Sequence, residues 1–172
     1  MVRIQRETPD QRAAVHSVAA AAFARPEQRG GPVAEATLID ELRASAAWLP
    51  ALSLVAVDAG VIGHVVCTRA HLGSAPVLGL GPLSVHPAHQ RRGVGLALMH
   101  AVLGAADALD EPLVVLLGDP GYYSRFGFRP AAGYGIAPPV PQWAPHFQAR
   151  TLTTFTPALR GTFAYAEPFN RV

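Results

Sequence analysis

The feature that most constrains the fold is the segment from Gly81 to Leu109, in which an apolar strand is followed by a polar loop and a long helix. The strand, Val77–Val85, leads through the loop Ala88–Arg92 into Gly93-Val94-Gly95. We expect a helix after this point because nearly every following residue is a helix former or packs as one. The first N–H groups of a helix lack intrahelical acceptors, and the helix dipole is positive there. With two arginines and two glycines beside it, this helix start predicts a site for a phosphate-bearing ligand.

Two common phosphate-binding motifs do not match this loop. A Walker loop requires a lysine after its last glycine, and the chain contains no lysine. The dinucleotide fingerprint GxGxxG would require glycine at the position of Leu98. The remaining pattern is Gln90-x-x-Gly93-x-Gly95, preceded by a strand that contains Gly81-Pro82.

A second motif lies downstream, at Gly118-Asp119-Pro120-Gly121-Tyr122-Tyr123-Ser124-Arg125-Phe126-Gly127-Phe128. Together the two motifs resemble those of the GNAT superfamily of N-acetyltransferases, in the order that the family has them. The second is similar to the version found in arylalkylamine acetyltransferases. The resemblance covers Val2–Phe128 well and the remainder only in outline. It implies one N-acetyltransferase domain over residues 1–172, an α/β fold with a mixed, splayed sheet of about seven strands and about four helices, and acetyl-CoA as cosubstrate.

The order of the expected elements agrees with this fold. Strands are expected at Val2–Arg6, Leu52–Val57, Val61–Thr68, Val77–Val85, Leu113–Leu117, His146–Phe155 and Gly161–Glu167. Thr8-Pro9-Asp10-Gln11 reads as a capping box that opens a helix, and a second helix is expected over Val33–Ala46. A short helix follows Asp119, and Arg25–Pro32 and Gly133–Pro145 are expected to be loops. Proline and glycines within Val77–Val85 disfavour a regular central strand. In the family the sheet opens there to admit the pantetheine arm of coenzyme A.

Composition narrows the class of protein. Half of the 172 residues are hydrophobic and 15% are charged, which favours a folded core over disorder. The net charge is +2 and the arginines are scattered, so no nucleic-acid partner is expected. No run approaches the ~20 apolar residues of a membrane span, so we expect a cytoplasmic protein without a membrane partner. Cys67 is the single cysteine, so an internal disulfide is excluded. The sequence leaves open whether the protein forms a homodimer.

The resemblance assigns the cofactor site to three segments. The pyrophosphate is expected over the N–H groups from Arg91 to Gly95, and the arginines either contact phosphate or line the solvated mouth. Backbone groups of Leu83 and Val85 are expected to pair with the pantetheine amides, as a strand pairs with a sheet edge. The complete expected set is Leu83, Ser84, Val85, Gln90, Arg91, Arg92, Gly93, Val94, Gly95, Asp119, Tyr122 and Phe126.

Tyr123 is the expected catalytic residue. By resemblance the family's tyrosine stands four residues before the glycine of Gly127-Phe128, and a phenol is suited to protonate a departing thiolate because the two pKa values are close. The alternative is that the aromatic residues of this segment only pack on the sheet, which we favour for Tyr122. Candidates for the base are Glu35, His64, Ser84, His86 and a water chain, and none is assigned.

The remaining polar and aromatic residues give weaker signals. The seven histidines show no metal-ligand spacing, so no metal is expected. Trp48, Trp143 and Phe147 either border the acceptor pocket or pack in the core. The sequence therefore favours an N-acetyltransferase that acts on the primary amine of a small molecule. A protein or peptide N-acetyltransferase and a non-catalytic CoA-binding regulator are the alternatives.

Overall fold

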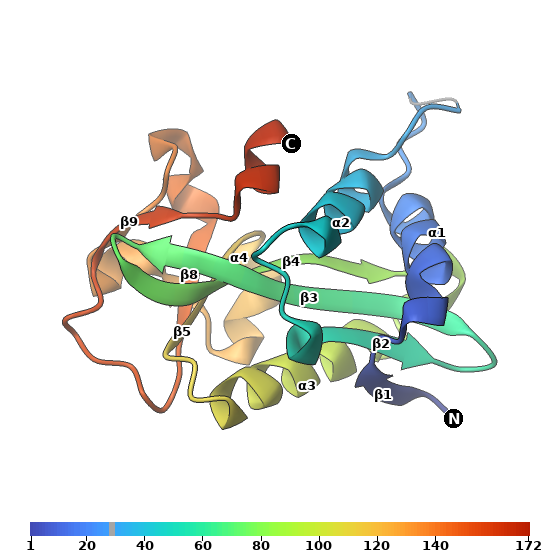
Figure 1. Ribbon diagram of the computed structural model, residues 1–172, viewed down its shortest axis with the longest axis horizontal. Helices are drawn as coiled ribbons and strands as arrows, with labels where there is room; N and C mark the ends of the chain where they lie inside the picture. Colours follow the sequence, from blue (N-terminus) through green and yellow to red (C-terminus); the bar gives the residue numbers. More distant parts are fainter. Residues whose placement is uncertain (28–29) are drawn as a thin grey trace.

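A mixed β-sheet with helices on both faces forms the frame of the protein (Figure 1). The structure is a computed structural model that describes residues 1–27 and 30–172. The strands are β1 (Arg3–Arg6), β2 (Ser53–Val57), β3 (Val61–Leu72), β4 (Ala75–Val85), β5 (Leu113–Leu117), β6 (Arg129–Pro130), β7 (Ile136–Ala137), β8 (Phe147–Thr151) and β9 (Gly161–Ala164). The α-helices are α1 (Arg12–Phe23), α2 (Ala34–Ala44), α3 (Val94–Ala108) and α4 (Pro120–Tyr123).

The helices divide between the two faces of the sheet. In Figure 1, α1 and α2 lie above the long hairpin of β3 and β4, and α3 crosses below it. The main path of the sheet runs β1-β2-β3-β4-β5-β8-β6, while β9 pairs with both β3 and β7. The segment Glu167–Arg171, a 3-10 turn, contacts α2 on the upper side.

The sheet opens between β4 and β5. These strands are parallel, and they pair only at Leu78↔Val114 and Gly79↔Val115. Beyond Gly79 the two strands separate, while β4 stays paired with β3 as far as Val85. The expected splay is therefore present, and it begins just before the Gly81-Pro82 step. The predicted mixed α/β architecture is confirmed.

Tyr165 fills the base of the opening between β4 and β5. A Cβ atom at Gly79 would lie 2.9 Å from the Tyr165 ring, so glycine permits the ring to lie against the β4 backbone. Burial raises the pKa of the Tyr165 phenol, and a hydrogen bond with the backbone of Leu117 at the end of β5 partly opposes this. The side chain thus contacts both strands at the point where they diverge.

The boundaries of several elements differ from the expected ones. The strand expected over Val61–Thr68 continues to Leu72, because β9 and β4 pair with its last residues. The helix opened by Thr8 begins as a 3-10 turn over Pro9–Gln11, in which Gln11 Oε1 accepts from the Thr8 N–H at 2.9 Å. The expected loop Gly133–Pro145 contains 3-10 turns and β7. Part of the expected loop Arg25–Pro32, residues 28–29, lies outside the described residues.

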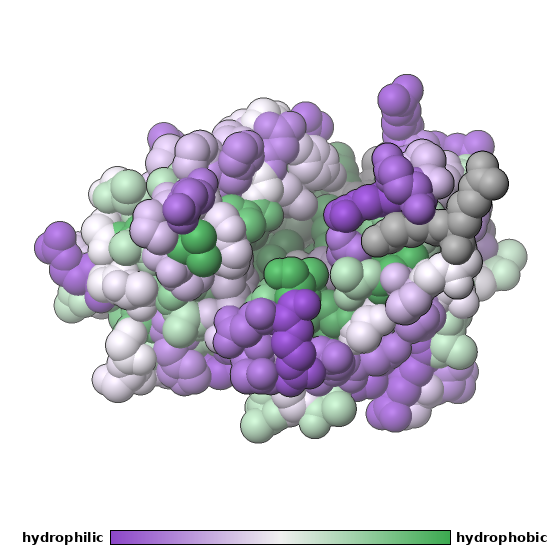
Figure 2. All heavy atoms as spheres, turned by 90° about the horizontal axis from the view of Figure 1, so that it is seen from above, coloured by the Kyte–Doolittle hydropathy of each residue, from purple (hydrophilic) through white to green (hydrophobic). Residues whose placement is uncertain are grey.

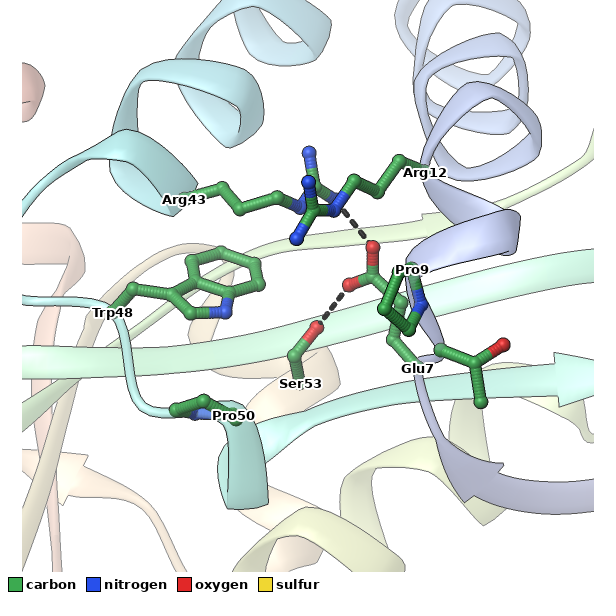
Figure 3. A pocket seen from close by; sticks show the side chains of 8 residues that line it. Glu7, Pro9, Arg12, Arg43, Trp48, Pro50 and Ser53 are labelled. Atoms are coloured by element: carbon green, nitrogen blue, oxygen red, sulfur yellow. Dashed lines mark hydrogen bonds and ion pairs between the residues drawn. The ribbon is translucent and has the colours of Figure 1, made fainter.

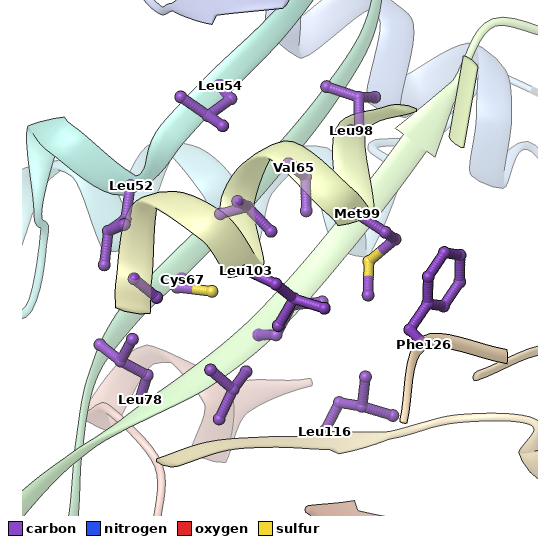
Figure 4. Close-up of a cluster of buried hydrophobic side chains, with 14 of the residues drawn as sticks. Leu52, Leu54, Val65, Cys67, Leu78, Leu98, Met99, Leu103, Leu116 and Phe126 are labelled. Carbon is purple, nitrogen blue, oxygen red and sulfur yellow. The ribbon is translucent and has the colours of Figure 1, made fainter. Parts of the chain in front are cut away.

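The main hydrophobic core lies between the sheet and α3 (Figure 4). Leu98, Met99 and Val102 of α3 are fully buried against strand residues such as Val65 and Leu78. This close approach depends on Gly63 of β3, where a Cβ atom would lie 3.0 Å from Leu98 and 3.1 Å from Val94. The packing at Gly63 therefore fixes the first turn of α3 on the sheet.

A buried polar cluster anchors α2 to the strands on the opposite side (Figure 3). The Ser53 hydroxyl donates to Glu7 at 2.5 Å and lies 2.9 Å from His64 Nε2, and Arg43 Nη2 of α2 lies 2.5 Å from Glu7. Burial would raise the Glu7 pKa, but the hydrogen bonds from His64 and Ser53 and the charge of Arg43 lower it to about 2. Burial lowers the pKa of His64. The cluster thus consists of an ionised pair and a neutral histidine.

Candidate active site

The loop after β4 and the first turn of α3 form one wall of a cavity of about 440 Å³. Its floor includes Leu83 and Val85 of β4, and its other wall is formed by Tyr122 and Arg125. The remaining lining residues are His89, Gln90, Arg91, Gly93, Val94, Gly95 and Leu96. The cavity therefore brings together the strand, the loop and the aromatic segment in which the sequence places the cofactor.

The loop is held in position by its own backbone and by Gln90. The Gln90 Nε2 group donates to the Val85 carbonyl at 3.0 Å, which links the loop to the end of β4. Arg91 and Gly93 adopt positive φ angles of 62° and 79°, so the chain turns sharply before α3 begins at Val94. The Ala97 N–H bonds to the Gly93 carbonyl at 3.0 Å. The preceding N–H groups have no intrahelical acceptor and are suited to hold an anion.

Gly95 leaves the space in which a bound pyrophosphate would need to approach the helix. A Cβ atom there would lie 3.0 Å from the Tyr122 hydroxyl and 3.7 Å from Val85 Cγ2, between the two walls of the cavity. No side chain occupies this position, and Arg91 and Arg125 supply positive charge at the lining. The charge and the free N–H groups at this lining therefore fit a diphosphate group chemically.

Four residues of the expected cofactor set do not line this cavity. Asp119 is exposed and caps α4, where its carboxylate accepts from the Gly121 N–H at 2.9 Å. Phe126 is buried in the main core and its ring packs edge-on against His100. The Ser84 side chain is buried, and Arg92 is exposed outside the lining. A role in cofactor binding stays a prediction for these residues.

The two adjacent tyrosines line different cavities. Tyr122 faces the cofactor cavity, whereas Tyr123 lines a second cavity of about 370 Å³. The Tyr123 ring lies against Gly118, where a Cβ atom would be 2.6 Å from the ring. Burial, with a smaller contribution from Tyr122, raises the pKa of Tyr123 to about 12. Tyr123 is a protonated phenol at neutral pH, as a free tyrosine would be, but the close match with a thiol pKa that was expected from the sequence is not found.

The second cavity shares one lining residue, Leu83, with the first. Its floor is the separated part of β4 and the end of β5, and its walls come from α1, α2 and the last third of the chain. The lining residues are Phe23, Glu35, Leu38, Leu80, Gly81, Pro82, Leu83, Leu116, Leu117, Tyr123, Trp143, Tyr165, Phe169 and Val172. Figure 2 shows this upper face of the molecule hollowed, with hydrophobic residues gathered in the hollow.

The candidate bases lie in different environments. Glu35 lines the second cavity, and its side chain is 19% exposed. His64 is fully buried in the polar cluster, and the Ser84 hydroxyl is buried beside it on β4. His86 Nδ1 accepts from the Ala88 N–H at 3.1 Å, in the turn before the loop. Among these candidates, only Glu35 lies on the lining of the second cavity.

The three aromatic residues that were candidates for the acceptor pocket lie in three different environments. Trp143 lines the second cavity, whereas Phe147 is 2% exposed and packs in the core. Trp48 stacks beneath Arg43 near the buried polar cluster. Sequence reasoning did not identify Phe23, Tyr165 or Phe169 as pocket residues. The aromatic character of the segment around Tyr165 was the available signal, but its position depends on the late strands.

Over residues 1–27 and 30–172, no group of three or more His, Cys, Asp or Glu side chains lies close enough to hold a metal ion. None of the helices in the described part of the chain is long and apolar enough to cross a membrane.

Comparison with known proteins identifies the family. Residues 50–130 match the model of an acetyltransferase (GNAT) domain. The N-acetyltransferase YhbS of Escherichia coli (strain K12) is 32% identical over 143 residues, which cover 80% of this chain and 84% of YhbS. The N-acetyltransferase YjhQ of the same strain is 34% identical over 143 residues, covering 78% of this chain and 79% of YjhQ.

Two solved structures share the whole fold. The crystal structure of Escherichia coli YhbS in complex with CoA has a TM-score of 0.89 and 28% identity, covering 99% of this chain and 92% of that chain. A GNAT family acetyltransferase from Brucella melitensis in complex with acetyl-CoA has a TM-score of 0.79 and 33% identity, covering 98% of each chain. The chain therefore belongs to the GNAT family of N-acetyltransferases and is an acyltransferase that uses acetyl-CoA as its cosubstrate.

Proposed function

We propose that this protein transfers the acetyl group of acetyl-CoA directly to a primary amine of a small molecule, with Tyr123 as the general acid. The observation that carries the proposal is that Leu83 lines both cavities. One cavity has the helix start and the arginines suited to a diphosphate, and the other has the buried phenol. An acyl group beside Leu83 would be accessible to an amine from the second cavity.

The chemistry assigns a task to each part of this site. A neutral amine forms a C–N bond with the acyl carbon while the C–S bond breaks, and the thiolate that departs takes a proton from the Tyr123 hydroxyl. The nitrogen releases one proton to solvent as the amide forms, and Tyr123 regains a proton from solvent. Counting from the ammonium form, one proton is released for each amide and thiol produced. The Tyr123 phenol is protonated at neutral pH, so the donor form is present before each turnover, while its raised pKa makes it a weaker acid than an exposed phenol.

The cavity volumes favour a small molecule over a polypeptide acceptor. The second cavity, about 370 Å³, is in the range of small-molecule pockets. Its walls come from α2 and from the segments that carry Trp143 and Phe169, and the Phe169 segment packs against α2. A peptide acceptor would require an extended groove that continues beyond these walls.

A thiol-release assay tests the proposal. The purified protein is incubated with acetyl-CoA and with a panel of small primary amines or short N-terminal peptides, and free CoA and the acetylated product are measured. We expect product with at least one small amine. Turnover only with peptides would contradict the small-molecule acceptor, and acetyl-CoA binding without turnover of any amine or peptide would support a regulator instead.

A further inference from the structure

The lining of the second cavity consists almost entirely of uncharged residues. Among its described lining residues, Glu35 is the only one with a charged side chain. The others are aliphatic, aromatic, glycine or proline residues. Neither arginine nor histidine is among them, so the described lining offers no cation to a bound carboxylate.

Aromatic rings from separate parts of the chain form one side of this cavity. The Tyr165 and Phe169 rings lie with their centroids 4.5 Å apart, and the Trp143 ring lies 6.4 Å from Tyr165. The segment that carries Phe169 packs against Leu38 and Leu42 of α2, beside an exposed ion pair between Arg171 and Glu41 at 2.8 Å. The rings are therefore held in place as a wall, and the surface that they present to an acceptor is apolar.

Glu35 is the second residue of α2 and also lines this cavity. Its described ionic partner, Arg25, is 3.5 Å away, and the Arg25 side chain is 63% exposed. Arg25 makes this single contact from a mostly exposed side chain, so solvent screens much of its effect on the Glu35 carboxylate. The Glu35 charge therefore acts on whatever enters the cavity.

On the basis of the proposed function, we infer that the acceptor is a primary amine with an apolar body and no acidic group. The aromatic wall and the leucines of the floor bind the hydrocarbon part, while Glu35 attracts the cationic form of the amine and repels carboxylates. A carboxylate in this cavity would lose its hydration without gaining a cationic partner. Acidic amines are therefore excluded by the same residues that bind apolar amines.

Two amines of equal length test the inference. Hexylamine ends in a methyl group, and 6-aminohexanoate ends in a carboxylate. We expect kcat/KM for hexylamine to exceed that for 6-aminohexanoate by roughly 100-fold, because the buried carboxylate remains unpaired. Ethanolamine, which is small and polar, is expected to be poorer than hexylamine by roughly tenfold or more.

Variants of Glu35 and Trp143 test whether these two residues determine the preference for hexylamine. Glu35→Gln is expected to lower the preference for hexylamine over 6-aminohexanoate by roughly tenfold, because the repulsive charge is removed. Asp110→Asn is the matched control, since it removes an exposed carboxylate outside the cavity and should leave the ratio unchanged. Trp143→Leu is expected to raise KM for hexylamine roughly tenfold while KM for acetyl-CoA stays the same.

The outcomes separate this inference from the proposed function. If 6-aminohexanoate or ethanolamine is acetylated as efficiently as hexylamine, the inference is wrong and the proposed function stands. If Glu35→Gln leaves the ratio unchanged, the role of Glu35 is wrong. If acetyl-CoA binds and no small amine is acetylated, the proposed function itself fails.

Discussion

At the scale of single residues, the site depends on glycines at positions where a larger side chain would clash with its neighbours. Gly95 leaves space between Tyr122 and Val85, and Gly118 lets the Tyr123 ring lie against the backbone. The spacing of Gln90, Gly93 and Gly95 made the first position predictable from sequence. Gly118 was predictable only as a motif residue, because its contact with the Tyr123 ring depends on how the turn between β5 and α4 folds.

Replacing Gly95 tests the steric account of the diphosphate site. Gly95→Val is expected to weaken acetyl-CoA binding roughly 10- to 100-fold, because filling the cavity costs about 1–3 kcal/mol. Arg91→Ala should weaken it less, since the backbone N–H groups remain. Gly104→Val, in the same helix with no neighbour within 4 Å of its Cβ position, is the control. Calorimetric titration that shows normal binding by Gly95→Val would contradict the account.

Replacing each tyrosine in turn tests the assignment of the acid. Tyr123→Phe is expected to lower kcat roughly 10²–10⁴-fold with little change in acetyl-CoA affinity, because only the proton donor is lost. Tyr122→Phe, which removes the hydroxyl near Gly95, should affect acetyl-CoA binding more than kcat. Steady-state kinetics with a fixed amine check both variants. A normal kcat for Tyr123→Phe would exclude it as the acid.

At the scale of elements, local pattern predicted the long strands and helices, and tertiary pairing decided the rest. The apolar run of β5 and the helix formers of α3 carry their own signals. The two-residue strands β6 and β7 carry none, because pairing with β8 and β9 alone makes them strands. The composition of Leu52–Thr68 predicted two strands, but not that His64 would join Glu7 and Ser53 in a buried cluster.

This buried cluster predicts how stability depends on pH. Burial lowers the pKa of His64, so between its folded value and 6.5 the unfolded chain binds more protons, and stability falls as the pH drops below 6.5. Each pH unit in this range costs up to about 1.4 kcal/mol. His64→Gln, which does not titrate, is expected to lose less stability between pH 7 and pH 5 than the wild type, as measured by urea unfolding.

The His64 prediction has a matched control in the same strand, and Glu7 adds a second pH dependence at lower pH. His71→Gln removes an exposed histidine from the same strand and should keep the pH dependence of the wild type. Glu7, with its pKa lowered from 4.5 to about 2, stabilises the fold above pH 4.5, and this contribution is lost as the pH falls from 4.5 to about 2. Equal pH dependence in His64→Gln and the wild type would contradict the assignment.

At the scale of the whole molecule, the two cavities differ in how far sequence could predict them. The cofactor cavity is built mainly from one continuous stretch, β4 through the start of α3, so a motif describes most of it. The second cavity takes Phe23 from α1, Glu35 from α2, and Trp143 and Phe169 from the last third of the chain. These residues are brought together only by the arrangement of helices around the opened sheet, which no local pattern encodes.

The most direct test of the central claim is a crystal structure of this protein with bound acetyl-CoA. We expect the diphosphate to lie against the backbone N–H groups from Arg91 to Gly95, the pantetheine arm to enter between β4 and β5, and the sulfur to lie beside the Tyr123 hydroxyl. A diphosphate bound away from residues 90–95, or a sulfur remote from Tyr123, would contradict the account.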